Sequence, residues 1–266
     1  QVAHGVALGQ RLGREVAFTD LTAVTGRVTR KWELDCFGIP RLPNTRATAL
    51  LMRARLQAAR RLQKLHSRLH LGVLDEDTGQ TADTFPGQVR VCSGYWQGEA
   101  FFADAAALVK ARLAFPALAH PPLERRAEVP HVAVHVRRGD YLTDPVARAY
   151  HLVCDEGWYK RAIEEMRARV PGARFHIFSD DPDWSETVFA GADDTDVMRG
   201  PPDAPAWTDM AAMSRYDHWV ISNSSYSWWA SYLGKAQESN IIAPDRWFAQ
   251  TPTKDLPICC ADWICM

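Results

Sequence analysis

The chain lacks any apolar run long enough to span a membrane, and its first residues show no signal peptide. It opens on Gln1 rather than methionine, so this absence says little about an anchor further upstream. Net charge is almost absent as well, and at −1 it gives no reason to expect a nucleic-acid partner. Hydrophobic residues make up 47% of the 266, which is ordinary for a globular protein with a buried core. We expect a cytoplasmic protein, with the inner face of the membrane as the alternative location.

No two cysteines have the Cys-x-x-Cys spacing of a zinc knuckle or a redox site. The six cysteines are scattered along the chain: Cys36, Cys92, Cys154, Cys259, Cys260 and Cys265. No nearby histidine completes a tetrahedral metal site with those at the end of the chain. We therefore predict reduced thiols in a reducing compartment. We also expect no cofactor.

Acidic residues are absent between Asp35 and Asp75, where the chain carries Arg41, Arg46, Arg53, Arg55, Arg60, Arg61, Lys64 and Arg68. An amphipathic helix is expected in this stretch, from Ala47 to about Leu71, with Leu51, Ala58, Leu62, Leu65 and Leu69 on its apolar face. A solvated helix face is the main interpretation. The alternatives are a peripheral membrane contact through the basic helix 47–71 and a landing site for an anionic acceptor.

Proline and charge crowd residues 116–130, where we place a boundary between halves 1–125 and 126–266. In the first half we expect helices at 1–13 and 104–115, with short strands at 15–21 and 89–93. In the second, strands at 131–136, 174–179, 218–222 and 240–243 alternate with helices at 156–170, from about 183, at 208–216 and at 227–236. This alternation predicts an α/β fold with a parallel sheet, whose ligands bind at the carboxyl ends of the strands.

Two arginines follow the first of these strands, in the segment His135-Val136-Arg137-Arg138-Gly139-Asp140-Tyr141. A guanidinium offers paired N–H donors and keeps its charge, which suits a phosphate. Adjacent residues on a strand point to opposite faces, so we expect at most one arginine to face a ligand. The other is predicted to hold the turn, paired with Asp140. An arginine pair on a surface turn is the common alternative.

Another apolar strand leads to a helix through Ser222-Asn223-Ser224-Ser225-Tyr226-Ser227-Trp228-Trp229. Hydroxyls and backbone N–H groups gathered at a helix N-terminus form an anion site that suits a pyrophosphate. Simple helix capping is the alternative, but it needs only one of these side chains.

A third strand ends in Phe178-Ser179-Asp180-Asp181-Pro182-Asp183-Trp184. The Asp-x-Asp pattern at Asp181 and Asp183, and again at Asp194 and Asp196, would suit a divalent metal. This pattern is frequent by chance, and Asp183 also fits the N-cap of the next helix. Metal binding is therefore the minority interpretation.

Together with Gly94-Tyr95-Trp96-Gln97, these motifs resemble the α1,2-fucosyltransferase family, most of all its bacterial members, in order over nearly the whole chain. Through the basic motif, that family is similar to α1,6-fucosyltransferases and protein O-fucosyltransferases. The resemblance implies an α/β fold of GT-B type, with two Rossmann-like halves and the active site in the cleft between them. It implies an acceptor side in 1–125 and a donor side in 126–266. GDP-fucose would be the donor and the 2-hydroxyl of a galactose-terminated glycan the acceptor, with inversion and no metal.

Family members usually begin with a strand and a Gly-Gly-Leu-Gly-Asn-Gln loop, and Gln1 matches the last residue of that loop. We therefore expect an N-terminal truncation. The loop lies at the cleft in related enzymes, so folding without activity is an expected outcome for the chain as it stands.

The resemblance places Arg137 at the β-phosphate, where it would stabilise the charge left on GDP in place of a metal. It places His135 near the nucleotide and four residues of the polar loop around the pyrophosphate: Asn223, Ser224, Ser225 and Ser227. Asp209 matches a position that takes the guanine N–H groups. An acid facing the helix dipole is the alternative for this residue.

The general base and the acceptor residues are the least defined. Asp140 is the nearest carboxylate for the base, His135 and His4 are weaker candidates, and a turn-stabilising role for Asp140 is the alternative. Trp96 and Gln97 are predicted to meet the acceptor, with core packing as the alternative for Trp96. Three other functions stay open: a fucosyltransferase of α1,6 or protein O-linked type, a metal-dependent Asp-x-Asp glycosyltransferase, and a non-catalytic nucleotide- or sugar-binding module.

Overall fold

The computed structural model describes residues 1–19, 32–39, 41–42, 45–61, 73–75, 91–118, 129–201, 203–252, 256 and 258–266. The chain divides into two compact units, Gln1–Ala114 and Phe115–Met266. The boundary predicted between residues 125 and 126 lies outside the described residues. The assignment of the two halves to acceptor and donor stays a prediction.

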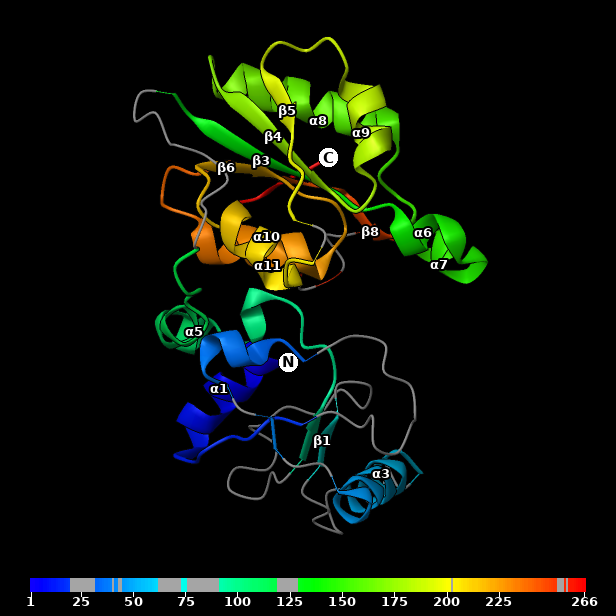
Figure 1. The fold of residues 1–266 in the computed structure, drawn as a ribbon. Helices are drawn as coiled ribbons and strands as arrows, with labels where there is room; N and C mark the ends of the chain where they lie inside the picture. The colour runs from blue at the N-terminus through cyan, green and yellow to red at the C-terminus, as the bar shows by residue number, and fades with distance from the viewer. Residues whose placement is uncertain are drawn as a thin grey trace. The chain divides into compact units, whose positions relative to one another are not determined.

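In its described residues, the N-terminal unit contains helices and one pair of parallel strands (Figure 1). Its elements are α1 (Val2–Leu12), η1 (Leu34–Phe37), α3 (Arg46–Arg61), β1 (Val73–Asp75), β2 (Val91–Ser93), η5 (Glu99–Phe101), η6 (Ala103–Ala105) and α5 (Ala106–Arg112). Helix α1 packs on α5 and η6, and Ala7, Phe102 and Val109 are fully buried in this unit. Gly9 of α1 permits the close approach of the segment that follows the helix, since a Cβ there would lie 2.8 Å from Val16.

Helix α3 departs from the predicted apolar face at Leu51. Leu51 is 56% exposed and Leu50 is 57% exposed, whereas Ala49 is buried. The expected face is therefore wrong at Leu51, and the part of the basic helix from 62 to 71 lies outside the described residues. The predicted strand near residue 15 is represented by a single parallel bridge between Phe18 and Arg41.

The C-terminal unit contains a parallel six-stranded sheet in the order β10-β7-β6-β3-β4-β5. Its strands are β3 (His131–Val136), β4 (Arg174–Ser179), β5 (Thr195–Val197), β6 (His218–Val220), β7 (Ile241–Ala243) and β10 (Ile264–Cys265). Read from β5, this is the Rossmann order 3-2-1-4-5-6. The predicted α/β class is confirmed. The GT-B arrangement of two halves about a cleft stays a prediction.

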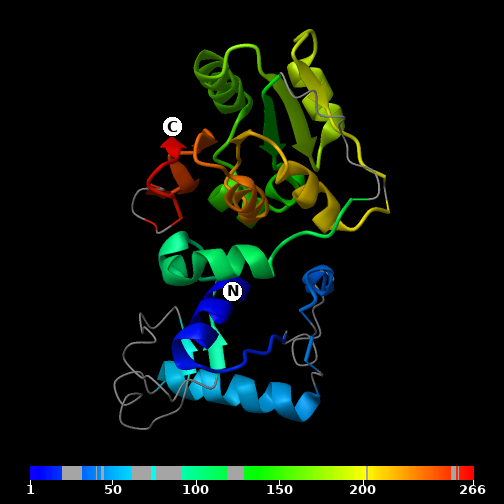
Figure 2. The ribbon, with the colours of Figure 1, turned by 90° about the vertical axis from the view of Figure 1, so that its left-hand side faces the viewer.

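Helices cover both faces of this sheet (Figures 1 and 2). One face carries α8 (Glu156–Arg169) and α9 (Pro182–Phe189), and the other carries α10 (Ala206–Met213) and α11 (Ser225–Gly234). With both faces covered, all six residues of β3 are buried, as expected for a central parallel strand. Each large apolar side chain in this core contributes roughly 1.5–3 kcal/mol through burial.

Two short helices and a hairpin lie beside the carboxyl edge of the sheet. Helices α6 (Gly139–Thr143) and α7 (Pro145–His151) follow β3 directly and pack on each other. The antiparallel hairpin of β8 (Arg246–Phe248) and β9 (Thr251–Pro252) follows β7, and β8 packs on α7. Asp144 caps α7 and Pro145 starts it, so a sequence signal for this helix exists.

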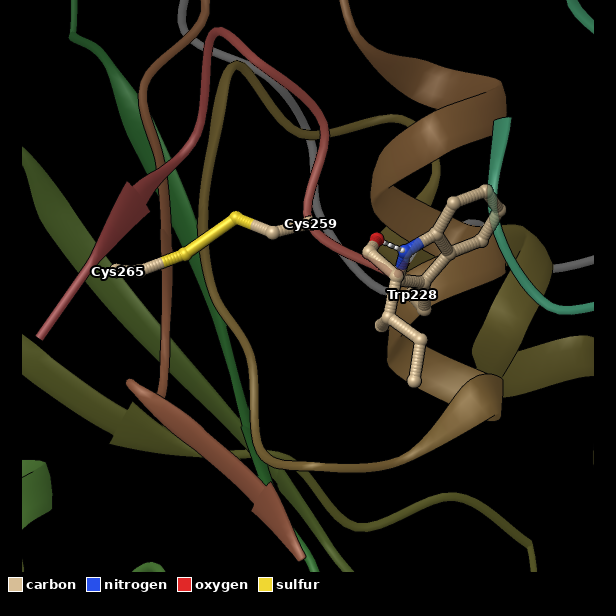
Figure 3. The surroundings of a disulfide bond; sticks show 4 residues. Trp228, Cys259 and Cys265 are labelled. Carbon is tan, nitrogen blue, oxygen red and sulfur yellow. Dashed lines mark hydrogen bonds between the residues drawn. A yellow bond between two sulfur atoms is a disulfide. The ribbon is translucent and has the colours of Figure 1, made fainter. Parts of the chain in front are cut away.

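The end of the chain is fastened to the sheet by several bonds. Figure 3 shows a disulfide between Cys259 and Cys265, and beside it the indole Nε1 of Trp228 donates to the carbonyl oxygen of Ile258 at 2.7 Å. The prediction of six reduced thiols is therefore wrong for this pair. Of the cysteines in the described residues, Cys36, Cys92, Cys154 and Cys260 take part in no disulfide. Their spacing gave no indication of the pairing, because β10 brings Cys265 back beside the preceding turn.

None of the helices within the described ranges is both long and apolar enough to cross a membrane.

Candidate functional site

The site lies at the carboxyl ends of β3 and β6, which are neighbours in the sheet. From β3 the chain proceeds through α8 to β4 on one side, whereas β6 and β7 lie on the other side. The strand order therefore reverses between β3 and β6, and open α/β sheets bind ligands at such a switch point. The arginine motif follows β3 and the polar loop follows β6, so the topology brings the two predicted anion-binding segments together.

Arg137 is the first residue after β3, and two carboxylates hold its guanidinium. One terminal nitrogen lies 2.7 Å from Asp180 Oδ2, and the other donates to Asp140 Oδ1 at 2.7 Å. The side chain is 23% exposed, and the ring of Tyr141 lies 5.6 Å from its Cζ. A fork fixed in this way is oriented before any ligand arrives, which is what recognition of a phosphate requires.

Arg138 points to a different set of partners. Its Nε donates to Asp181 Oδ2 at 3.1 Å, and its guanidinium stacks on the ring of Trp184 at 3.8 Å. The predicted pair of Arg138 with Asp140 is wrong, because Asp140 pairs with Arg137 instead. The expectation that the two arginines diverge is confirmed. Arg138 holds the start of α9, while Arg137 stays at the strand end.

Asp180 is a site residue that the sequence reasoning missed. Its Oδ1 accepts the backbone N–H of Arg138 at 2.8 Å, and its Oδ2 accepts that of Gly139 at 3.1 Å in addition to the Arg137 guanidinium. A Cβ at Gly139 would lie 2.7 Å from Oδ2, so glycine permits this close approach. One carboxylate thus fixes both the turn and the arginine that follows β3.

A buried polar network connects β3 with β6. His135 Nδ1 and Ser222 Oγ lie 2.8 Å apart, and the backbone N–H of Arg137 donates to Tyr159 Oη at 3.3 Å. Tyr159 is also hydrogen-bonded to Ser222, and burial raises the pKa of its phenol well above the usual range. Burial and then the charge of Arg137 lower the pKa of His135 to about 3. His135 is therefore neutral at physiological pH and too weakly basic to serve as a general base.

The polar loop presents only part of its polar groups to solvent. Ser224 caps α11, its Oγ accepting the N–H of Tyr226 at 3.3 Å, and Ser225 is exposed in the first turn. The ring of Tyr226 lies 5.5 Å from that of His135, and its hydroxyl donates to the carbonyl oxygen of Ala206. The start of α11 therefore lies beside both His135 and the start of α10.

Two of the predicted pyrophosphate ligands are occupied within the protein. Both N–H groups of the Asn223 amide donate to carbonyl oxygens, to His151 at 2.8 Å and to Trp247 at 3.0 Å. Ser227 is 1% exposed, and its hydroxyl donates to the carbonyl oxygen of Ser224 at 3.2 Å. The predicted roles of the Asn223 and Ser227 side chains are therefore corrected: these groups fix the loop, and a ligand does not reach them.

Asp209 lies in the first turn of α10. Its carboxylate has no hydrogen-bond or ion-pair partner among the described residues, and a Cβ at Gly200 would lie 3.2 Å from its Oδ1. The residue keeps an exposed surface, yet desolvation by the surrounding chain raises the pKa of its carboxyl. Both α10 and α11 begin at the carboxyl edge of the sheet, so Asp209 lies near the start of the polar loop.

The four carboxylates of the Asp-x-Asp patterns each pair with a different arginine. Asp181 binds Arg138, and the other three pair as Asp183 with Arg199, Asp194 with Arg167 and Asp196 with Arg174. Asp181 rather than Asp183 is the N-cap of α9, which corrects that prediction. Within the ranges that the structure describes, no group of three or more His, Cys, Asp or Glu side chains is arranged to hold a metal ion.

The predicted acceptor residues lie in the N-terminal unit. Trp96 is 5% exposed and its ring stacks on His4 at 4.2 Å, so the packing alternative holds and the sugar-stacking role is corrected. The backbone at Trp96 is left-handed, with φ of 49°, between Gly94 and Gly98, which also have positive φ. The Nε2 of Gln97 is buried and makes no hydrogen bond within the described residues. His4 is buried, and its Nδ1 lies 3.1 Å from the carbonyl oxygen of Phe101.

A Rossmann sheet with polar groups at its switch point is typical of nucleotide-binding α/β proteins. Residues 93–266 match the family model described as glycosyl transferase family 11. This range is well over half of the chain, so the chain belongs to glycosyl transferase family 11. The resemblance predicted from the motifs is confirmed.

Curated relatives from bacteria and animals match part of the chain. It is similar to the O-antigen biosynthesis glycosyltransferase WbnK of Escherichia coli, 33% identical over 117 residues, which are 44% of this chain and 39% of the relative. It is similar to an α-1,2-colitosyltransferase of Escherichia coli, 32% identical over 50% of this chain and 46% of the relative. It is also similar to human galactoside α-(1,2)-fucosyltransferase 1, 29% identical over 44% of this chain and 33% of the relative. The chain thus spans less than half the length of these relatives.

Proposed function

We propose that this protein is a fucosyltransferase that moves L-fucose from GDP-fucose to the 2-hydroxyl of a galactose-terminated glycan, with inversion at the anomeric carbon. The observation that carries the proposal is that Arg137 and the start of α11 follow two neighbouring strands, β3 and β6, at the switch point of a Rossmann sheet. Family membership supports glycosyl transfer, and two relatives have an α-1,2 linkage in their names. Other linkages, the α1,6 and protein O-linked types included, have no specific observation in their favour.

In this proposal the donor diphosphate binds between Arg137 and the first turn of α11. Asp140 is 52% exposed, so a phosphate oxygen can replace it on the guanidinium, while Asp180 keeps the guanidinium in place. Ser225 and the N–H groups at the start of α11 would bind the same diphosphate. As the bond from C1 of fucose to the β-phosphate oxygen breaks, these donors stabilise the negative charge that GDP takes away. A preorganised donor of this kind contributes about 3–4 kcal/mol to the transition state.

Asp209 is proposed to read the guanine. Its carboxylate has no protein partner among the described residues and can accept two N–H groups of a guanine edge.

Gln97 is kept as an acceptor residue because its amide nitrogen is buried without a hydrogen bond in the described residues. The proposal includes a cytoplasmic location. It also includes contact with the membrane through α3, which has exposed Leu50 and Leu51 and several basic residues.

GDP is expected to raise the melting temperature of the folded chain, because it binds only the native site. At a concentration 100 times the Kd, the gain is about 2.7 kcal/mol. Differential scanning fluorimetry with GDP and with CMP, which lacks the guanine edge, measures the effect. If the melting temperature of the folded protein does not change in millimolar GDP, the proposed nucleotide binding is contradicted.

Transfer is expected to survive EDTA, because Arg137 and the start of α11 supply the positive field that a metal gives elsewhere. The assay compares fucose transfer by the full-length protein before and after chelation. Activity that vanishes in EDTA and returns with manganese or magnesium would place the metal-dependent Asp-x-Asp alternative first. Binding of GDP without any transfer or hydrolysis would favour the non-catalytic module.

A further inference from the structure

His151 is the last residue of α7 and lies inside an aromatic cluster at the carboxyl edge of the sheet. Its ring stacks on Tyr141 of α6, with centroids 5.0 Å apart and planes at 14°. The ring of Tyr150 meets it edge-on at 4.9 Å, and Phe248 of β8 lies 5.5 Å away. The Asn223 amide fixes its carbonyl oxygen. Three segments of the C-terminal unit therefore hold this imidazole in one orientation.

The cluster is continuous with the proposed donor site. The Tyr141 ring that stacks on His151 also lies 5.6 Å from the Arg137 guanidinium. Asp140 pairs with Arg137, and its charge also acts on His151. The imidazole is thus one aromatic ring away from the arginine that we place on the leaving phosphate.

The other candidates for a general base are poor ones. Asp140 is already engaged in an ion pair with Arg137, and His135 is buried with a pKa of about 3. His4 is buried in the N-terminal unit, stacked against Trp96. His151 is only half-buried: its Nδ1 is enclosed without a hydrogen bond among the described residues, and Nε2 is the ring nitrogen that meets solvent.

We propose that His151 is the general base of the transfer reaction, with Asp140 as its charge partner; this inference rests on the proposed function. Nε2 takes the proton of the acceptor hydroxyl while the hydroxyl oxygen forms a bond to C1 of fucose. The bond between C1 and the β-phosphate oxygen breaks, and its electron pair leaves with GDP. The resulting imidazolium loses its proton to solvent.

The charges around His151 suit this role. Burial lowers the pKa of its imidazole from 6.5, and Asp140 raises it in part, so the ring is neutral at physiological pH and able to accept a proton. Once the imidazolium forms, Asp140 stabilises it. The charged residues on the elements packed around the ring are Asp140 on α6, with Arg137 just before it, Arg148 on α7, with Asp144 as its N-cap, and Arg246 on β8.

The pH profile of transfer should therefore show an acid limb that belongs to His151. The base works only when neutral, so transfer falls as the pH drops through its pKa, which lies below 6.5. His151→Phe keeps an aromatic ring in the stack and removes the proton acceptor. We expect kcat to fall about 10²- to 10⁴-fold, the acid limb to disappear, and GDP affinity to change less than about twofold, as for a base that does not touch the nucleotide.

Tyr150→Phe is the matched control, because it disturbs the same cluster without removing a base, and it should transfer like the unaltered protein. His151→Ala with added imidazole is the second test, and partial recovery of transfer is expected. The inference is overturned if His151→Phe transfers normally with its acid limb intact, or if imidazole restores nothing to a folded His151→Ala protein that still binds GDP. Failure of the unaltered protein to bind GDP would instead remove the proposed function itself.

Discussion

Replacing Arg137 with lysine is expected to lower fucose transfer by at least about 10²-fold, with little change in melting temperature. The guanidinium uses one terminal nitrogen on Asp180 and the other on Asp140, the position proposed for a phosphate oxygen. Lysine keeps the charge but has no fork, so it cannot bind Asp180 and a phosphate in the same geometry. The measurements are kcat, GDP affinity and melting temperature.

Arg138→Lys is the matched comparison and should show the opposite balance. This change removes the stack on Trp184 and the Nε bond to Asp181, neither of which involves the proposed ligand. We expect a loss of about 1–2 kcal/mol in the free energy of unfolding, with GDP affinity nearly unchanged. Loss of GDP binding in Arg138→Lys but not in Arg137→Lys would mean that the roles are reversed.

Replacing Asp180 with asparagine is expected to lower both stability and transfer. The two carboxylate oxygens accept N–H groups from Arg137, Arg138 and Gly139, and the side chain is only 26% exposed. The asparagine amide would place its NH₂ group against one of these donors. Loss of the charged acceptor is expected to lower the free energy of unfolding by about 2–4 kcal/mol. Arg137 also loses the partner that positions it, so we expect kcat to fall by at least about tenfold.

Asp183→Asn provides the control for this change, since it makes the same substitution three residues away. Its side chain is 86% exposed and pairs only with Arg199 at the surface, so stability and transfer should stay within error of the unaltered protein. Chemical denaturation and initial rates measure both variants. If Asp180→Asn resembled Asp183→Asn in stability and rate, Asp180 would not be the residue that fixes the turn.

The central strands could be predicted from the sequence because their residues alone define them. Strands β3 and β4 begin and end at the predicted limits, 131–136 and 174–179. Helix α8 ends within a residue of its predicted limit, since Asp155 caps its start and Gly172 follows its end. Such local signals need no knowledge of tertiary contacts.

Elements whose identity depends on neighbours were missed. Strand β5 has three residues, and its pairing with β4 defines it. Helices α6 and α7 were not predicted, although Asp144 and Pro145 form a recognisable helix start. This omission mattered for function, because α7 carries His151.

Within the candidate site, the sequence indicated which segments meet but not which atoms pair. The divergence of the two arginines was predicted from strand geometry, whereas the choice of Asp140 by Arg137 depends on how α6 turns. Asp180 contacts Arg138 and Gly139 across about 40 positions of sequence, a separation that no local pattern reveals. Asn223 and Ser227 looked available as ligands because burial of their side chains is set by the fold.

The most direct measurement of the central claim is a transfer assay on the full-length protein. GDP-fucose is incubated with a panel of β-galactosides, and mass spectrometry with linkage analysis identifies the products. We predict release of GDP together with a product that carries fucose on the 2-hydroxyl of galactose, and loss of that product in Arg137→Lys. A folded protein that binds GDP but leaves every galactoside unmodified, or that transfers equally well without Arg137, would contradict the account.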